Sequence, residues 1–105
     1  MLTRELAREF LACLKEGRYY DAHEVLEAVW FPRRTEKSPE VLLLKGLINA
    51  SVSCELHKLG RPRKAPGPWN VYLKYRAHLP QIGAKNPLYF ELDNALHAVQ
   101  RSFHE

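Results

Sequence analysis

The sequence predicts a small all-α protein: a compact bundle of stacked helical hairpins with five helices, the third central and buried, and no sheet. Apolar residues recur at spacings of three and four over most of the chain, and no segment alternates with a period of two as strands do. The length of 105 residues suits one domain, which we assign to residues 1–105. Apolar residues form 46% of the chain, enough for a core without disulfides or a metal.

The first two helices are expected at residues 2–15 and 20–31. Their apolar residues fall on one face of each helix. These residues are Leu6, Ala7, Phe10, Leu11 and Leu14 in the first helix, and Ala22, Val25, Leu26, Val29 and Trp30 in the second. Gly17 is a typical stop after the first helix, and Pro32 prevents the second from continuing.

The third helix is expected at residues 39–59, with Ser38 as its N-cap and Pro39 in its first position. Its apolar residues point in nearly all directions: Leu42, Leu43, Leu44, Leu47, Ile48, Ala50, Val52, Cys54, Leu56 and Leu59. A helix that is apolar on most sides is covered by neighbours on most sides. We therefore expect it at the centre of the bundle.

The C-terminal part is expected to hold two further helices. Residues 61–68, with three prolines and three basic residues, form a loop. The fourth helix is expected at residues 69–79, ended by Pro80, and residues 81–85 connect it to the fifth, which Asn86-Pro87 begins. The fifth helix has a one-sided apolar seam that could mediate a homodimer or pack on the domain's own core.

Composition argues against several classes of protein. No apolar run reaches 18 residues, so we expect no membrane span, and the N-terminus lacks the pattern of a signal peptide, so we expect a cytoplasmic protein. Cys13 and Cys54 lie in apolar helical stretches and are expected to be buried thiols, with neither disulfide nor zinc pairing. The net charge of +4 is too small to indicate a nucleic-acid binder.

Residues 17–30 hold the most distinctive polar side chains. His23 and Glu27 lie one helical turn apart with Trp30 on the same stripe, at the rim of the apolar face, whereas Glu24 points away from it. A carboxylate one turn from a histidine can fix the tautomer of its imidazole, as in a general base or a metal ligand.

The third helix offers partners for this pair. Its Gly46, Ala50, Ser53 and His57 share a narrow stripe of mostly small residues, and Lys45 and Asn49 lie on the adjacent stripe. Polar groups on an otherwise apolar helix are costly unless they are paired. Because consecutive helices usually pack together, we predict that His23 and Glu27 meet Asn49, His57 or Lys45 across the interface between helices two and three.

Three interpretations of this polar cluster stay open. It can be a structural network that fixes the register of two helices, or a site for a small ligand or protein partner flanked by Tyr19 and Trp30. The third is an active or metal site. There His23 would act as general base, Glu27 would orient it, and His57 or Lys45 would meet the substrate, or His23, Glu27 and His57 would bind a metal. We favour a binding domain, with no cofactor predicted.

A second alternative is weak nucleic-acid binding through the basic loop of Arg61, Arg63 and Lys64. Trp69 and Tyr72 follow that loop and are expected to be core residues, although they could form a stacking platform. His78, His97 and His104 are expected at the surface.

Two segments resemble a known family: residues 17–30, and residues 44–50 followed by Leu56-His57. Over about residues 5–65 the chain resembles a bacterial and archaeal family catalogued as domain of unknown function 309. The resemblance implies an all-helical fold and no established activity. By the same resemblance the family's marked positions are His23, Glu24, Glu27, Trp30, Lys45, Gly46 and His57.

The chain departs from this family pattern in two places. Asn49 stands where the family has glutamine, which keeps the amide but shortens its reach. After Gly60, residues 61–68 replace the family's Asn, two residues, Gly and Ala, so the next helix is expected to start late.

Overall fold

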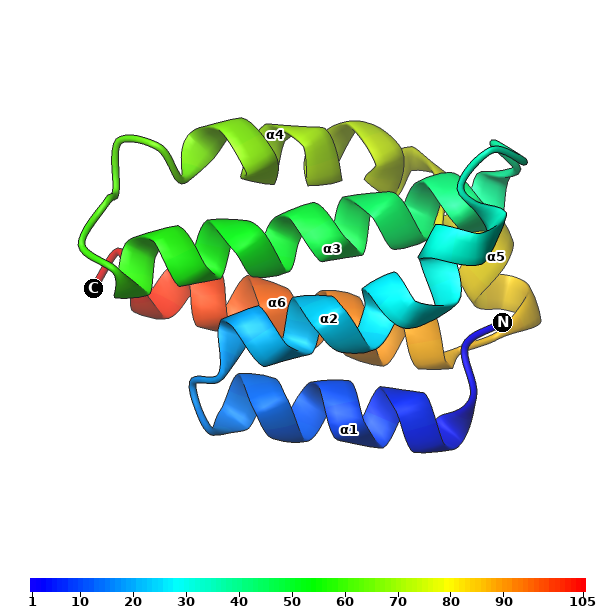
Figure 1. Ribbon diagram of the computed structural model, residues 1–105, viewed down its shortest axis with the longest axis horizontal. Coiled ribbons are helices and arrows are strands. Elements are labelled where there is room, and N and C mark those ends of the chain that lie inside the picture. The colour runs from blue at the N-terminus through cyan, green and yellow to red at the C-terminus, as the bar shows by residue number, and fades with distance from the viewer.

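The computed structural model describes residues 1–105 and is all-α (Figure 1). Its helices are α1 (Arg4–Lys15), α2 (Tyr19–Trp30), α3 (Pro39–Lys58), α4 (Pro66–Tyr75), α5 (Leu79–Lys85) and α6 (Leu88–Ser102). Two short 3₁₀ helices, η1 (Phe31–Arg33) and η2 (Arg76–His78), follow α2 and α4. The predicted helical bundle without strands is confirmed.

The helices form antiparallel hairpins around α3 (Figure 1). In sequence order α1 pairs with α2 and α3 pairs with α4, while α6 contacts both α1 and α3. Ten of the twenty residues of α3 are buried. The third helix is therefore central, as its apolar residues indicated.

Capping side chains and glycines determine where α1 and α3 begin and end. Thr3 caps α1 by accepting from Leu6 N–H at 3.1 Å, and Ser38 caps α3 by accepting from Val41 N–H at 3.3 Å. Gly17 and Gly60 follow α1 and α3 with φ angles of +74° and +75°, a left-handed backbone that favours glycine. The C-terminal ends of α1 and α3 lie at the same side of the bundle (Figure 1).

The prolines around α4 and α5 required a correction. The fourth helix begins at Pro66, three residues earlier than expected, and Pro80 lies in the first turn of α5, where a helix end was predicted. The expected connection 81–85 lies within this additional helix. The physical reason is that N–H groups of a first helical turn have no intrahelical acceptor, so proline fits there at little cost.

The apolar seam predicted for the fifth helix, which is α6 in the structure, packs against the core of the domain. Tyr89, Leu92 and Leu96 are fully buried, and Val99 and Phe103 pack against the same core. Cys13 and Cys54 are buried free thiols, as expected. Burial raises the pKa of the Cys54 thiol to about 12. None of the helices has the length and apolar character needed to cross a membrane.

Candidate functional site

His23 and Glu27 form an ion pair on the outer flank of α2. The imidazole Nε2 lies 3.2 Å from Glu27 Oε2, and Nδ1 lies 2.8 Å from the carbonyl oxygen of Tyr20. The His23 side chain is 15% exposed, whereas that of Glu27 is 46% exposed. Both partners of the imidazole therefore come from its own helix.

These contacts define how the imidazole can be protonated. A carbonyl oxygen only accepts, so Nδ1 must be the donor toward Tyr20. In the neutral ring Nε2 would then be an acceptor facing an acceptor carboxylate, whereas the protonated ring donates to both partners. The contact with Tyr20 therefore makes Nδ1 the nitrogen that carries the proton in the neutral ring.

Beside this pair the surface is hollowed. The hollow has a volume of about 310 Å³ and is lined by Glu24, Glu27, Ala28, Phe31 and Pro32. Phe31 is 52% exposed, and the guanidinium of Arg34 lies 3.8 Å from the centroid of its ring. Tyr20, one turn before Glu24 on the same helix, is 59% exposed, and its ring lies 4.9 Å from the ring of His23. Two carboxylates thus lie between two exposed aromatic rings.

Lys45 and Asn49 do not join this pair. The Asn49 side chain donates to the carbonyl oxygen of Lys45 at 2.8 Å, within α3. The Lys45 ammonium lies 5.8 Å from the ring of Tyr75 and so approaches α4. No hydrogen bond or ion pair links His23 or Glu27 to α3, and the predicted polar contact across the α2–α3 interface is wrong.

The stripe of small residues on α3 explains this error. A side chain on Gly46 would begin 3.1 Å from Tyr75 Cβ and 3.3 Å from Tyr72 Cδ1, and Ser53 Oγ donates to the carbonyl oxygen of Ala65 at 2.8 Å. The close approach that the stripe predicted is real. However, the helix that uses it is α4, and α2 packs elsewhere on α3.

His57 lies at the end of the bundle where α6 finishes. Its ring stacks on Phe103 at 4.8 Å, and His104 lies 5.4 Å away. Tyr19, predicted to flank the site, also contacts Phe103 at 5.9 Å. Nowhere in the molecule do three His, Cys, Asp or Glu side chains gather closely enough to hold a metal ion. The alternative metal set of His23, Glu27 and His57 is therefore not assembled.

Burial, together with the charge of His104, lowers the pKa of His57. As the pH falls, the unfolded chain takes up this proton first. The stability that depends on His57 is therefore complete above about pH 6.5 and decreases below it. We predict that the melting temperature of the wild type falls more between about pH 7.5 and 5.5 than that of His57→Gln. His78→Gln serves as the control. An equal pH dependence of the melting temperature in the wild type and in His57→Gln would contradict a lowered pKa of His57.

Trp30, the other predicted flanking aromatic, is partly buried against the core. Its ring contacts Phe31 at 6.4 Å. The indole Nε1 is buried and has no hydrogen-bond partner. Trp30 therefore supports the end of α2 from inside, while Phe31 forms the exposed surface.

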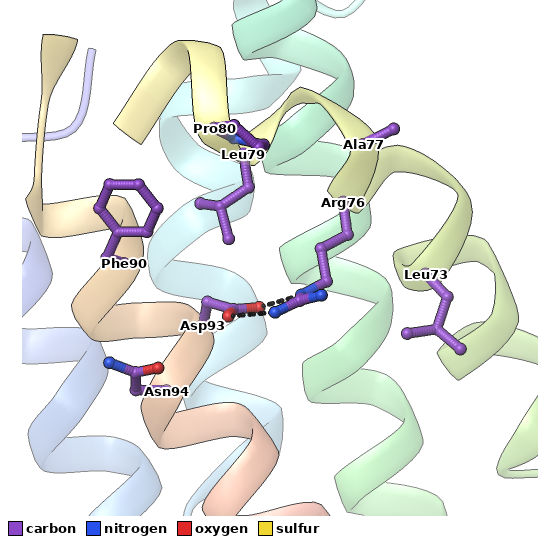
Figure 2. A pocket seen from close by; sticks show the side chains of 8 residues that line it. All are labelled: Leu73, Arg76, Ala77, Leu79, Pro80, Phe90, Asp93 and Asn94. Atoms are coloured by element: carbon purple, nitrogen blue, oxygen red, sulfur yellow. Dashed lines mark hydrogen bonds and ion pairs between the residues drawn. The ribbon is translucent and has the colours of Figure 1, made fainter. Parts of the chain in front are cut away.

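A second polar cluster, which the sequence analysis missed, joins α4 to α6. Asp93 is 5% exposed, and the Arg76 guanidinium donates to both of its oxygens, at 2.8 and 3.0 Å (Figure 2). The Tyr72 hydroxyl also donates to Asp93, and the Nδ1 of His97 lies 3.3 Å from its Oδ1. Burial raises the pKa of the Asp93 carboxyl, and the charge of His97 acts in the opposite direction.

One feature of the sequence indicates this cluster. Asp93 lies directly beside Leu92 on the buried seam, and His97 follows one turn later. A carboxylate at a core position indicates a buried partner. His97, expected at the surface, is partly buried and contacts the rings of Trp69 and Tyr72 at 5.2 and 5.9 Å.

The basic loop is solvent-exposed: Arg61, Arg63 and Lys64 have no acidic partner. The stacking platform considered beside it is not formed. Tyr72 is fully buried and Trp69 is partly buried in contact with it. Nucleic-acid binding by base stacking thus lacks exposed rings at this position.

Fold and site together define a small all-helical domain with an acidic and aromatic hollow on one helix and a buried Asp93 cluster near the C-terminus. The model of a family described as a domain of unknown function (DUF309) matches residues 7–67, more than half of the chain. The chain belongs to this family. No curated protein and no solved structure matches it. The family match includes α2 and α3 and ends before the Asp93 cluster.

Proposed function

We propose that the chain is a protein-binding domain that recognises a basic segment of a partner through the outer face of α2. The observation that carries this proposal is the hollow in which Glu24 and Glu27 lie beside the ring of Phe31, which is 52% exposed while the guanidinium of Arg34 covers one of its faces. Carboxylates and aromatic rings are the groups that bind lysine and arginine side chains, by ion pairing and by cation–π contact.

The charges of this face favour a basic partner. Glu24 forms no ion pair within the chain, and Glu27 pairs only with His23. The chain as a whole has a net charge of +4, so two acidic side chains in one hollow form a local exception. Such a patch orients a partner of opposite charge and makes binding selective for that partner.

The shape of the hollow favours a protein segment over a small molecule. All five lining residues lie between positions 24 and 32, on α2 and the short helix η1 that follows it. A hollow with walls from one helix cannot enclose a ligand from several sides, as small-molecule sites usually do. A side chain that a partner protein presents from its own surface needs no such enclosure.

The enzyme alternative has less support. Both ring nitrogens of His23 lie against groups of its own helix, Nδ1 against the carbonyl oxygen of Tyr20 and Nε2 against the Glu27 carboxylate, and no residue of α3 contacts the ring by a hydrogen bond. Lys45 and His57, the groups proposed to meet a substrate, contact Tyr75 and Phe103. The cytoplasmic location of a bacterial protein stays a prediction, consistent with two buried free thiols.

Binding of two fluorescent peptides tests the proposal. One is a capped octapeptide that alternates leucine and arginine, and the other has glutamine in place of arginine. We expect the wild type to bind only the arginine peptide, and Glu24→Gln/Glu27→Gln to weaken this binding about fivefold, as loss of two rim charges should. Fluorescence anisotropy at rising salt is the measurement.

The control removes the same two charges elsewhere. Glu5 and Glu9 are exposed acidic residues on α1 outside the hollow, and Glu5→Gln/Glu9→Gln should leave binding unchanged. Equal weakening by both double variants would show unspecific attraction and contradict the proposal. So would equal binding of the two peptides.

A further inference from the structure

The largest pocket of the molecule lies away from α2, where α4 and η2 meet α5 and α6 (Figure 2). Its volume is about 570 Å³, within the range of roughly 300–1,000 Å³ that small-molecule sites have. Its walls come from four consecutive elements, whereas the hollow on α2 has walls from one helix and its turn. This pocket is therefore suited to a small ligand.

The polar group of the pocket is the guanidinium of Arg76. It uses Nε and Nη2 to hold Asp93, which leaves three of its five N–H donors free. Arg76 is 43% exposed and Asp93 only 5%. The carboxylate thus lies on the protein side of the pair, and the remaining donors of Arg76 have no partner within the chain. The two bonds to Asp93 fix the guanidinium in one orientation.

The contacts of Asp93 decide which charge a ligand should carry. Its oxygens already accept from Tyr72 and Arg76, with His97 close by. A cationic ligand would therefore find the carboxylate covered. An anionic oxygen would meet the unused N–H groups of Arg76, which match the geometry of a carboxylate.

The rest of the pocket is apolar. Leu73 and Phe90 are among the few large apolar side chains that are strongly exposed, at 45% and 39%, and both line it. The Phe90 ring lies directly on Gly83, where a Cβ atom would approach it to 2.4 Å. Gly83 therefore lets Phe90 lie against α5 and close that side of the pocket. Leu79 points toward the Arg76–Asp93 pair (Figure 2).

We propose that this pocket binds an organic monocarboxylate with an apolar tail. Its carboxylate accepts from the unused N–H groups of Arg76, and its tail lies against Leu79 and Phe90. The pocket is separate from the peptide-binding face of α2, so either proposal can fail without the other.

Titration of the ¹⁵N-labelled full chain with hexanoate, 1-hexanol and hexylamine, followed by NMR, tests the inference. We expect hexanoate to shift the amide signals of residues 73–80 and 90–94. It should bind about tenfold more tightly than 1-hexanol, as one charge-assisted hydrogen bond predicts. Equal binding of 1-hexanol or hexylamine would overturn the ligand class. Shifts confined to the basic loop 61–64 would overturn the site.

Variants separate the polar and the apolar contributions. Because Asp93 would lose its partner in a single variant, we use Arg76→Gln/Asp93→Asn, which removes both charges together. We expect this double variant to lose the preference for hexanoate over 1-hexanol. Phe90→Ala should weaken the binding of hexanoate and of 1-hexanol alike, by about threefold. Arg101→Gln, the control, should leave the binding of both unchanged. A folded double variant that keeps the tenfold preference would overturn the role of Arg76. If the double variant does not fold, the comparison of the three probes on the wild type still tests the ligand class, and Phe90→Ala still tests the site.

Discussion

Asp93→Ala is expected to lower the free energy of unfolding by about 3 kcal/mol. The carboxylate is 5% exposed and accepts from Tyr72 and Arg76. Its removal leaves the buried Tyr72 hydroxyl without a partner and the charge of Arg76 uncompensated. Arg76 is 43% exposed and can turn toward water, which keeps the loss below the upper limit for a buried pair. Denaturant unfolding followed by circular dichroism measures the change.

Two variants make this prediction specific. Asp93→Asn keeps an acceptor for Tyr72 and should lose less than Asp93→Ala. Asn94→Ala changes an exposed neighbour on the same helix and should stay within about 0.5 kcal/mol of the wild type. A loss below about 1 kcal/mol for Asp93→Ala would mean that the cluster does not hold α4 against α6.

Gly46→Val is expected to destabilise the protein by about 3 kcal/mol. A Cβ atom at this position would begin 3.1 Å from Tyr75 Cβ, 3.3 Å from Tyr72 Cδ1 and 3.4 Å from Tyr72 Cα. Tyr72 Cα and Tyr75 Cβ can move only together with the backbone of α4, and the Tyr72 ring is buried, so the added methyl groups can be accommodated only if α4 moves away from α3. The buried Tyr72 ring would lose its packing in the same movement.

Gly67→Val is the matched control for Gly46→Val. Gly67 is also a helical glycine, and no atom lies within 4 Å of a Cβ placed there. We expect its substitution to cost clearly less than Gly46→Val, because only the following Pro68, which disfavours a β-branched residue before it in a helix, opposes the change. Equal effects of the two variants in thermal unfolding would contradict the close α3–α4 packing.

Much of the fold could be predicted from local signals. The stops at Gly17 and Gly60, the cap at Ser38 and the all-round apolar character of residues 39–59 correspond to what the structure has. Pro66 and Pro80 misled the prediction of α4 and α5, since a proline marks the end of one helix and the first turn of the next equally well.

The candidate site was harder to predict because helical spacing places residues on a face without saying which neighbour covers that face. The His23–Glu27 pair follows from a spacing of four within one helix. The stripe of Gly46 and Ser53 predicted a close neighbour, but the identity of that neighbour as α4 depends on long-range packing. The bond between Arg76 and Asp93 spans 17 residues of sequence and has no local pattern.

The central claim is that the acidic and aromatic face of α2 binds a basic segment. Mapping of amide chemical-shift changes in the ¹⁵N-labelled chain, on addition of the leucine–arginine octapeptide, tests it most directly. We expect the largest changes at residues 20–32, and we expect Glu24→Gln/Glu27→Gln to need about fivefold more peptide to reach the same changes. Changes centred on α1 or α6, or changes at α2 that reach the same size at the same peptide concentration in this double variant, would contradict the claim.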